Sequence, residues 1–153
     1  MRRLKDFIVF CLKISLLQFI TYVIFGLTFS VLLHYKEIWN EPIIKDYLKD
    51  FSSKWLMIGP LLQPIRGLLI SLILWFIIDF FHETKKGWLK LWGVFVIIGI
   101  ICTPMSSPGS MEGFIYSKLP IWFHLIMLPE VLLQTLLLSI TIIFWDKKRY
   151  NMK

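Results

Sequence analysis

The chain has 153 residues, of which 57% are hydrophobic and only 18% are charged, and it carries a formal net charge of +7. Soluble domains of this size are about 25% charged, and several apolar stretches here exceed the roughly 20 residues that cross a bilayer. This composition excludes a soluble enzyme, a disordered chain and a secreted disulfide scaffold. It predicts an all-α integral membrane protein, in which the basic excess marks orientation and does not indicate nucleic-acid binding.

Four apolar segments are predicted to cross the membrane as a four-helix bundle that forms a single domain over residues 1–153. Each is long enough to cover about 30 Å of hydrocarbon at about 1.5 Å per residue, the third only just. The first follows basic residues, as a signal peptide would, but it is too long for a signal-peptide core and lacks a clear cleavage site. The predicted spans are residues 7–33, 55–81, 88–104 and 120–145.

Basic side chains outside the spans predict the orientation of the bundle. Ten Lys and Arg lie on the face that holds both chain ends, against five on the other face, so the ten-charge face is expected in the cytoplasm. We therefore expect a multi-pass plasma-membrane protein whose N-terminus and C-terminus are both cytoplasmic. The ten residues are Arg2, Arg3, Lys5, Lys85, Lys86, Lys90, Lys147, Lys148, Arg149 and Lys153.

The connection between the first two spans is predicted to contain a short amphipathic helix over residues 41–52. Asn40 is a suitable N-cap, and Pro42 falls in the first turn. Apolar residues then recur at helical spacing opposite charged ones, as in a helix that lies on a membrane or covers a bundle. Either covering the bundle or recognising a partner would explain this helix.

The second span contains two prolines, Pro60 and Pro64, each of which removes a backbone hydrogen-bond donor. Two interpretations follow. Either the helix starts only at one of the prolines, or the span is broken at membrane depth, as in transporters that bind substrate at such breaks. In both cases Arg66 is expected in the outer half of the membrane.

The fourth span carries a polar stripe. Glu130 lies about 15 Å below Pro120 along a helix, near the middle of the bilayer, and Gln134 and Thr141 share its face. The stretch that precedes this span, residues 106–113, is dense in turn-forming residues and is expected to fold back over the helix ends.

Ionisable and amide side chains inside a membrane normally face the protein interior or a cavity. Arg66 and Glu130 are expected at similar depths, where they would form an ion pair, or Glu130 would take up a proton. Such a polar layer either fixes helix register or lines a cavity open to the outside. The candidate binding residues are Arg66, Glu130, Gln63, Gln134, Gln18 and His124.

The remaining charged, histidine and cysteine residues are assigned structural roles. Lys13 and Asp79 are expected to act as anchors near the cytoplasmic helix ends, and His82 as an ordinary surface residue. His124 is interpreted as a hydrogen-bond partner of the 106–119 loop, through Glu112 or Tyr116. No metal or other cofactor is predicted, and the two cysteines, expected to be buried at opposite ends of the bundle, should not pair: these are Cys11 and Cys102.

These features favour a transport or channel-type protein whose cavity is lined by the candidate residues. Four short helices leave little room for a pore, so a conducting path would need a homo-oligomer.

One alternative is a membrane enzyme at the outer leaflet, with Glu130 or His124 as acid or base and Arg66 holding a lipid-linked substrate. The other is an accessory subunit that docks a membrane-protein partner. Apart from such partners, only the lipid bilayer is expected to be bound, and a non-enzymatic role is favoured.

Overall fold

The computed structural model describes the backbone of residues 4–150 and the side chains of residues 4–56 and 58–146. This part of the chain is helical and contains no strand. Three helices are long and apolar enough to cross a membrane, namely α1, α4 and the Ile121–Asp146 part of α7. The elements are α1 (Leu4–Leu32), α2 (Tyr35–Asn40), α3 (Pro42–Tyr47), α4 (Lys54–Glu83), α5 (Gly87–Val96), the π-helical turn η1 (Ile97–Ile101), α6 (Met111–Tyr116) and α7 (Ile121–Tyr150).

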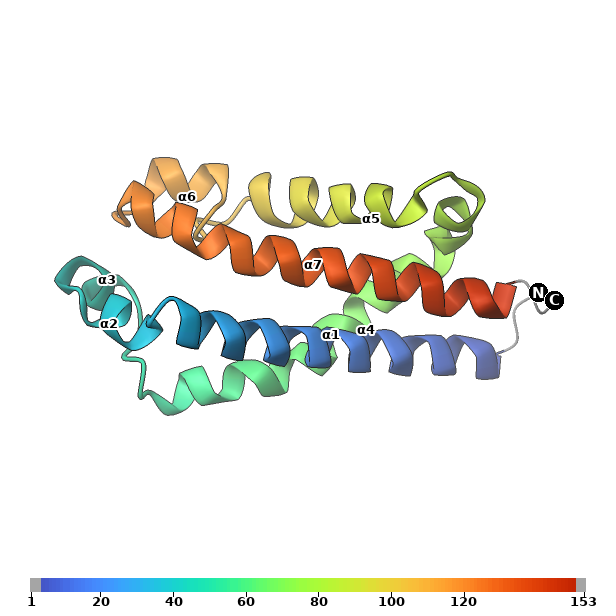
Figure 1. Ribbon diagram of the computed structural model, residues 1–153, viewed down its shortest axis with the longest axis horizontal. Helices are drawn as coiled ribbons and strands as arrows, with labels where there is room; N and C mark the ends of the chain where they lie inside the picture. The colour runs from blue at the N-terminus through green and yellow to red at the C-terminus, as the bar shows by residue number, and fades with distance from the viewer. Residues whose placement is uncertain (1–3, 151–153) are drawn as a thin grey trace.

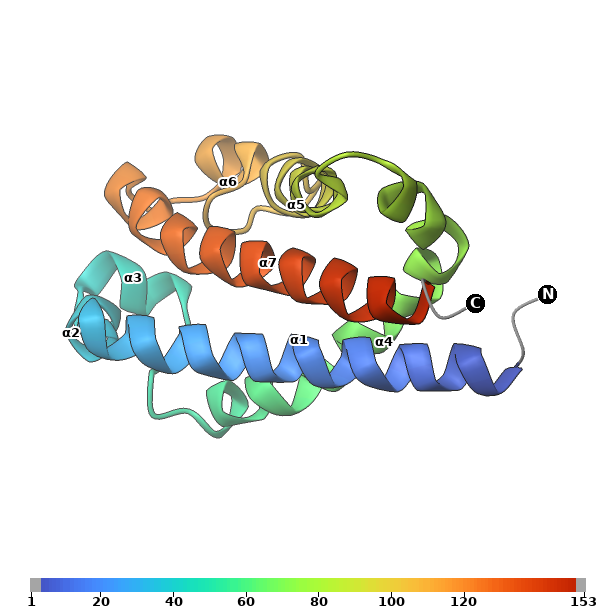
Figure 2. The ribbon, with the colours of Figure 1, turned by 45° about the vertical axis from the view of Figure 1, so that its right-hand side comes forward.

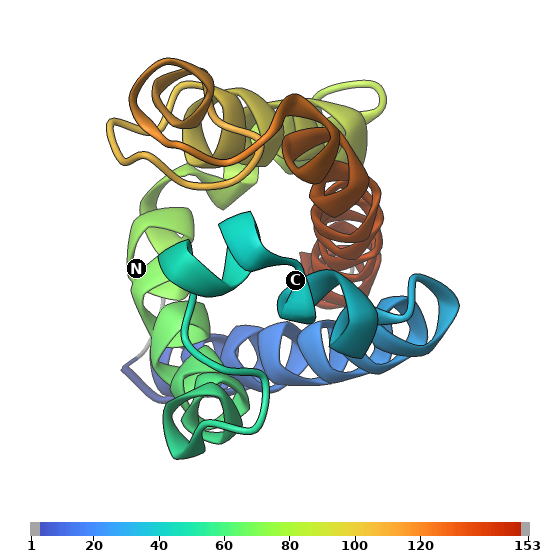
Figure 3. The same cartoon turned by 90° about the vertical axis from the view of Figure 1, so that its left-hand side faces the viewer.

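The long helices run side by side in alternating directions, so that α1 begins and α7 ends at the same end of the bundle (Figure 1). We call this the terminal end. The short helices α2, α3 and α6 gather at the opposite end, which we call the cap end (Figures 1 and 2). Seen end-on, α2 and α3 lie across the middle of the bundle (Figure 3).

The side chains of α1 divide into an outward and an inward face. The outward face is an apolar stripe that repeats every three or four residues, as expected for a helix surrounded by lipid. The inward face contributes Phe10, Ile14 and Leu17 to the main apolar core, which is completed by side chains of α4, α5 and α7. The exposed stripe consists of Leu4, Ile8, Leu12, Leu16, Ile20, Ile24, Leu27 and Val31.

Both sequence interpretations of the second span were wrong, because α4 is one continuous helix with Pro60 and Pro64 inside it. It starts at Lys54 because the Ser53 side chain caps it by accepting a hydrogen bond from the Trp55 N–H. A proline inside a helix bends it and does not have to end it, and Figure 1 shows α4 changing direction along its length.

The third expected span, residues 88–104, is shorter in the structure. The apolar helix runs from Gly87 to Ile101, as α5 and then η1, which gives about 22 Å at about 1.5 Å per residue. Pro104 lies in the loop beyond it. The Trp92 indole N–H donates to the Leu132 carbonyl oxygen at 3.1 Å, which fastens α5 to α7.

The outer helix predicted over residues 41–52 is found only in part. Asn40 ends α2 and does not cap the next helix; Glu41 occupies the N-cap position of α3, without a side-chain hydrogen bond. The helix ends at Tyr47, and Ile44 is its one buried residue. Ile44 packs with Leu119 and Phe123 in a second, smaller apolar core at the cap end.

Candidate functional site

Polar side chains cross-link α1 and α4 where the two helices pack closely. Gln18 donates a hydrogen bond to Gln63 at 2.9 Å, and the pair is buried. The Ser15 hydroxyl donates to the Pro64 carbonyl at 2.6 Å. Gly67 permits this approach, because a Cβ there would lie 2.6 Å from the Ser15 Cα. Two of the candidate residues, Gln18 and Gln63, are therefore hydrogen-bonded to each other across the interface between α1 and α4.

Glu130 is directed toward the cap end of the bundle. Its carboxylate accepts a hydrogen bond from the Tyr35 hydroxyl of α2. A Cβ on Gly26 of α1 would lie 3.7 Å from the second carboxylate oxygen, so α1 passes close to the acid. Burial, together with the neighbouring carboxylate, raises the pKa of Tyr35, so this hydroxyl stays protonated and acts as the donor.

Arg66 does not form the ion pair with Glu130 that the sequence had left open, and it has no carboxylate partner among the described side chains. It is exposed on α4. Tyr22 of α1 lies in the same region of the bundle as these two charges. The Tyr22 hydroxyl also approaches α4, at 3.6 Å from the position of a Cβ on Gly59. Tyr22, Arg66, Glu130 and Tyr35 are therefore the residues of the cap-half site.

The expected polar stripe below Glu130 is only partly realised. Gln134 is buried. Thr141 donates its hydroxyl hydrogen to carbonyls of its own helix, those of Leu137 and Leu138. A hydroxyl bonded in this way already has its hydrogen-bond acceptors within its own helix and does not need a ligand as a partner.

His124 is fully buried and holds the loop between η1 and α7. Its Nδ1 accepts the Gly109 N–H at 3.0 Å, and its Nε2 lies 3.2 Å from the Ser117 hydroxyl. Its ring stacks on Phe114 at 4.4 Å. The loop is thus the partner, as expected, but through Gly109 and Ser117 and not through Glu112 or Tyr116. Because both ring nitrogens have hydrogen-bond partners in the loop, His124 has a structural role.

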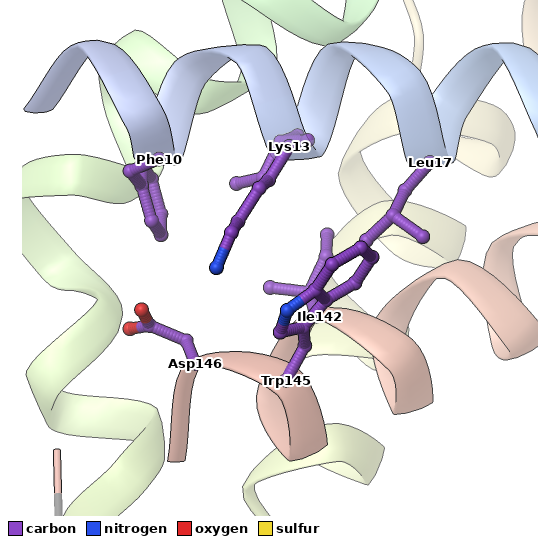
Figure 4. Close-up of a pocket in the computed structure, with 7 residues that line it drawn as sticks. Phe10, Lys13, Leu17, Ile142, Trp145 and Asp146 are labelled. Carbon is purple, nitrogen blue, oxygen red and sulfur yellow. The ribbon is translucent and has the colours of Figure 1, made fainter. Parts of the chain in front are cut away.

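A second polar cluster lies at the terminal end. His82 of α4 places Nε2 2.9 Å from Oδ2 of Asp146 on α7, and the two side chains are 1% and 15% exposed. Lys13 sits over the Trp145 ring, 5.0 Å from its centroid. Figure 4 shows the Lys13 amine and the Asp146 carboxylate pointing into one small pocket between α1 and α7. The expectation that His82 is a surface residue was wrong.

The sequence also missed Tyr22 and Tyr35, because tyrosine in an apolar segment is ordinarily taken as an interface residue. Their positions gave one usable signal, since Tyr22 lies one turn after Gln18 on the face that contacts α4. Among residues 4–150, no group of three or more His, Cys, Asp and Glu is arranged to hold a metal ion. Cys11 is buried, as expected, whereas Cys102 is exposed, and both are free thiols.

Comparisons of the chain with protein-family models, with curated proteins and with solved structures found no match.

Proposed function

We propose that the protein is a small transport or channel-type membrane protein in which Arg66 binds an anionic group and Glu130 binds and releases a proton. In this proposal all four apolar helices lie in the membrane, with the ten-charge terminal end in the cytoplasm of a plasma membrane. The cap end then faces outward, and the cap-half site lies nearer the outer than the inner surface.

The observation that carries the proposal is that Glu130 bonds to the neutral Tyr35, while Arg66, exposed on α4, makes no ion pair with Glu130 or with another described carboxylate. An intramembrane arginine keeps its charge, and leaving it without a carboxylate is costly unless another anion compensates it. That cost favours an anionic ligand at Arg66.

Glu130 differs from Arg66 because it can lose its charge. Tyr35 donates a hydrogen bond to the carboxylate, and a protonated Glu130 would still accept that hydrogen bond through its carbonyl oxygen. The same contact is therefore compatible with both protonation states. This makes Glu130 suited to carry a proton while the cap helix stays in place.

Proton movement in proteoliposomes tests the proposal. Purified protein is reconstituted with an internal pH-sensitive dye, a potassium diffusion potential is imposed, and inorganic phosphate, acetate and a short-chain alkyl phosphate are added in turn. We expect at least one of these anions to accelerate proton uptake. Glu130→Gln should abolish the uptake, and Arg66→Gln should abolish its dependence on the anion.

Matched variants separate the site from general effects of charge. Glu112→Gln and Lys54→Gln remove the same charges outside the site, in α6 and in the first turn of α4, and should leave the uptake unchanged. If wild type and Glu130→Gln move protons equally while both remain folded, the proposed function is wrong.

The enzyme alternative is weakened by His124, because both of its ring nitrogens are already engaged within the loop. An accessory role would leave the proton uptake absent in every variant, including wild type. In that case a partner that copurifies in fixed stoichiometry would replace transport as the assigned role.

A further inference from the structure

Arg66 stands in the middle of an apolar stripe that faces away from the bundle. The stripe follows one face of α4 at spacings of three and four residues. Leu62 and Leu69, the neighbours of Arg66 on either side, are 54% and 58% exposed, and Phe76 at the far end is 84% exposed. Besides Arg66, the members of this α4 stripe are Ile58, Leu62, Leu69, Ile73 and Phe76.

The depth of Arg66 fits a ligand that arrives from the lipid. Arg66 lies about 16 Å along α4 from Trp55 near the cap end, and about 22 Å from Phe81 near the terminal end. Its side chain is long enough to reach toward the outer headgroups, while the stripe below it continues through the apolar layer. A headgroup at Arg66 would thus have its chain beside Leu69 and Phe76.

We propose that the anion recognised at Arg66 is the phosphate or carboxylate headgroup of an amphiphile that enters laterally from the outer leaflet and lays its chain along the α4 stripe. This inference rests on the proposed function and names its substrate class. The Arg66 guanidinium would bind the headgroup in a bidentate manner.

An amphiphile fits this surface better than a water-soluble anion does. The side chains on both sides of Arg66 along the stripe are apolar and outward-facing, so a soluble anion would have to leave water to reach it. An amphiphile already has its chain in hydrocarbon, and only its headgroup has to move. The unmatched positive charge of Arg66 supplies the complementary attraction.

Lipid retention and acyl-chain crosslinking test the inference. The protein is placed in phosphatidylcholine nanodiscs doped with a phosphatidic acid that carries a photoactivatable group in its chain. We expect crosslinks to residues 69–76 of α4 and bound phosphatidic acid in native mass spectra. Arg66→Gln should lower both signals roughly tenfold, and Arg66→Lys should lower them less, because lysine cannot make the bidentate contact.

The control and the competitors decide between ligand sources. Lys54→Gln removes an exposed cation from the same helix and should leave both signals unchanged. A short-chain phosphatidic acid should compete with the probe, whereas inorganic phosphate should not. Competition by inorganic phosphate alone, equal retention by Arg66→Gln, or crosslinks that join two copies of the chain at this stripe would each overturn the inference.

The outcome is separable from that of the proposed function. If Glu130→Gln stops proton uptake while Arg66→Gln retains the lipid probe normally, the amphiphile assignment fails and the transport function stands. If the probe binds as expected but no anion drives proton uptake, the amphiphile site stands and the transport function fails.

Discussion

The two polar clusters of the bundle differ in whether their ionisable side chains have an oppositely charged partner. At the terminal end, His82 and Asp146 lie 2.9 Å apart in a nearly sealed contact beside the main apolar core. In the cap half, Glu130 bonds to the neutral Tyr35, and Arg66 is left exposed without a carboxylate among the described side chains. The contact between His82 and Asp146 joins α4 to α7, whereas a cation without a carboxylate beside it is suited to bind an anionic ligand. For this reason the proposed function is placed in the second cluster.

The largest expected effect comes from the close contact of α1 and α4, on which the position of Tyr22 relative to Arg66 depends. A Cβ on Gly67 would meet the Ser15 Cα at 2.6 Å and the Gln18 Cβ at 2.9 Å. Gly67→Leu should force the helices apart, lower the free energy of unfolding by about 3 kcal/mol and disrupt the cap-half site.

The measurement is thermal unfolding in detergent together with the proton-uptake assay. Gly93→Leu is the matched control, because a Cβ on Gly93 meets nothing within 4 Å. Equal losses of stability in the two variants would contradict the close α1–α4 contact.

At the terminal end, Asp146→Ala should destabilise the protein without altering proton uptake per folded molecule. Removing the carboxylate leaves the buried His82 ring without this hydrogen bond, at an expected cost of about 1–3 kcal/mol. Unfolding in detergent measures the loss, and uptake is normalised to folded protein. A specific loss of proton uptake with unchanged stability would show that the terminal cluster takes part in transport, contrary to the structural role given to it above.

In the cap half, Tyr35→Phe removes the donor to Glu130 while keeping the ring that packs against Trp39 at 5.3 Å. We expect a loss of stability of about 1 kcal/mol and a shift in the pH dependence of proton uptake, since the carboxylate loses the hydrogen bond that favours its charged form. An unchanged pH profile would show that Tyr35 is only a packing residue.

The smallest expected effect concerns the loop held by His124. Ser110 caps α6 by accepting the Gly113 N–H at 2.9 Å, and its hydroxyl also bonds the Met105 and Ser107 carbonyls. Ser110→Ala should cost about 1 kcal/mol and leave both polar clusters intact. Proteolysis of the loop in intact vesicles measures the change, with Ser106→Ala as the comparison. Loss of proton uptake in Ser110→Ala would connect the loop to the site.

The helical class was predicted correctly, and three of the four predicted spans correspond to helices long and apolar enough to cross a membrane. Both follow from the length of the apolar runs, which the thickness of the bilayer dictates. The sequence did not predict the continuity of α4, since each proline leaves only one carbonyl, that of Leu56 or of Pro60, without its helical donor, and a helix can accommodate this loss by bending.

The sequence named Arg66 and Glu130 as candidate residues, but it named neither Tyr22 nor Tyr35, and it did not predict which side chains contact one another. Depth placed Arg66 and Glu130 at comparable levels, but whether they pair depends on helix rotation, and the rotation is fixed by contacts such as Gly67 on Ser15. Tyr35 was missed because the chain reverses direction after α1 and brings α2 back over the bundle, which no local pattern indicates. His82 was misassigned because its neighbours along the chain are charged, while its partner Asp146 lies on a distant helix.

Infrared difference spectroscopy of the reconstituted protein tests the central claim most directly, because it observes the protonation of Glu130 itself. A short-chain phosphatidic acid is added to wild type and to Glu130→Gln, and the protonated-carboxyl region is compared before and after binding. The account predicts a carboxyl band that changes on binding in wild type, is absent from Glu130→Gln and is lost in Arg66→Gln. Identical difference spectra for wild type and Glu130→Gln would contradict it.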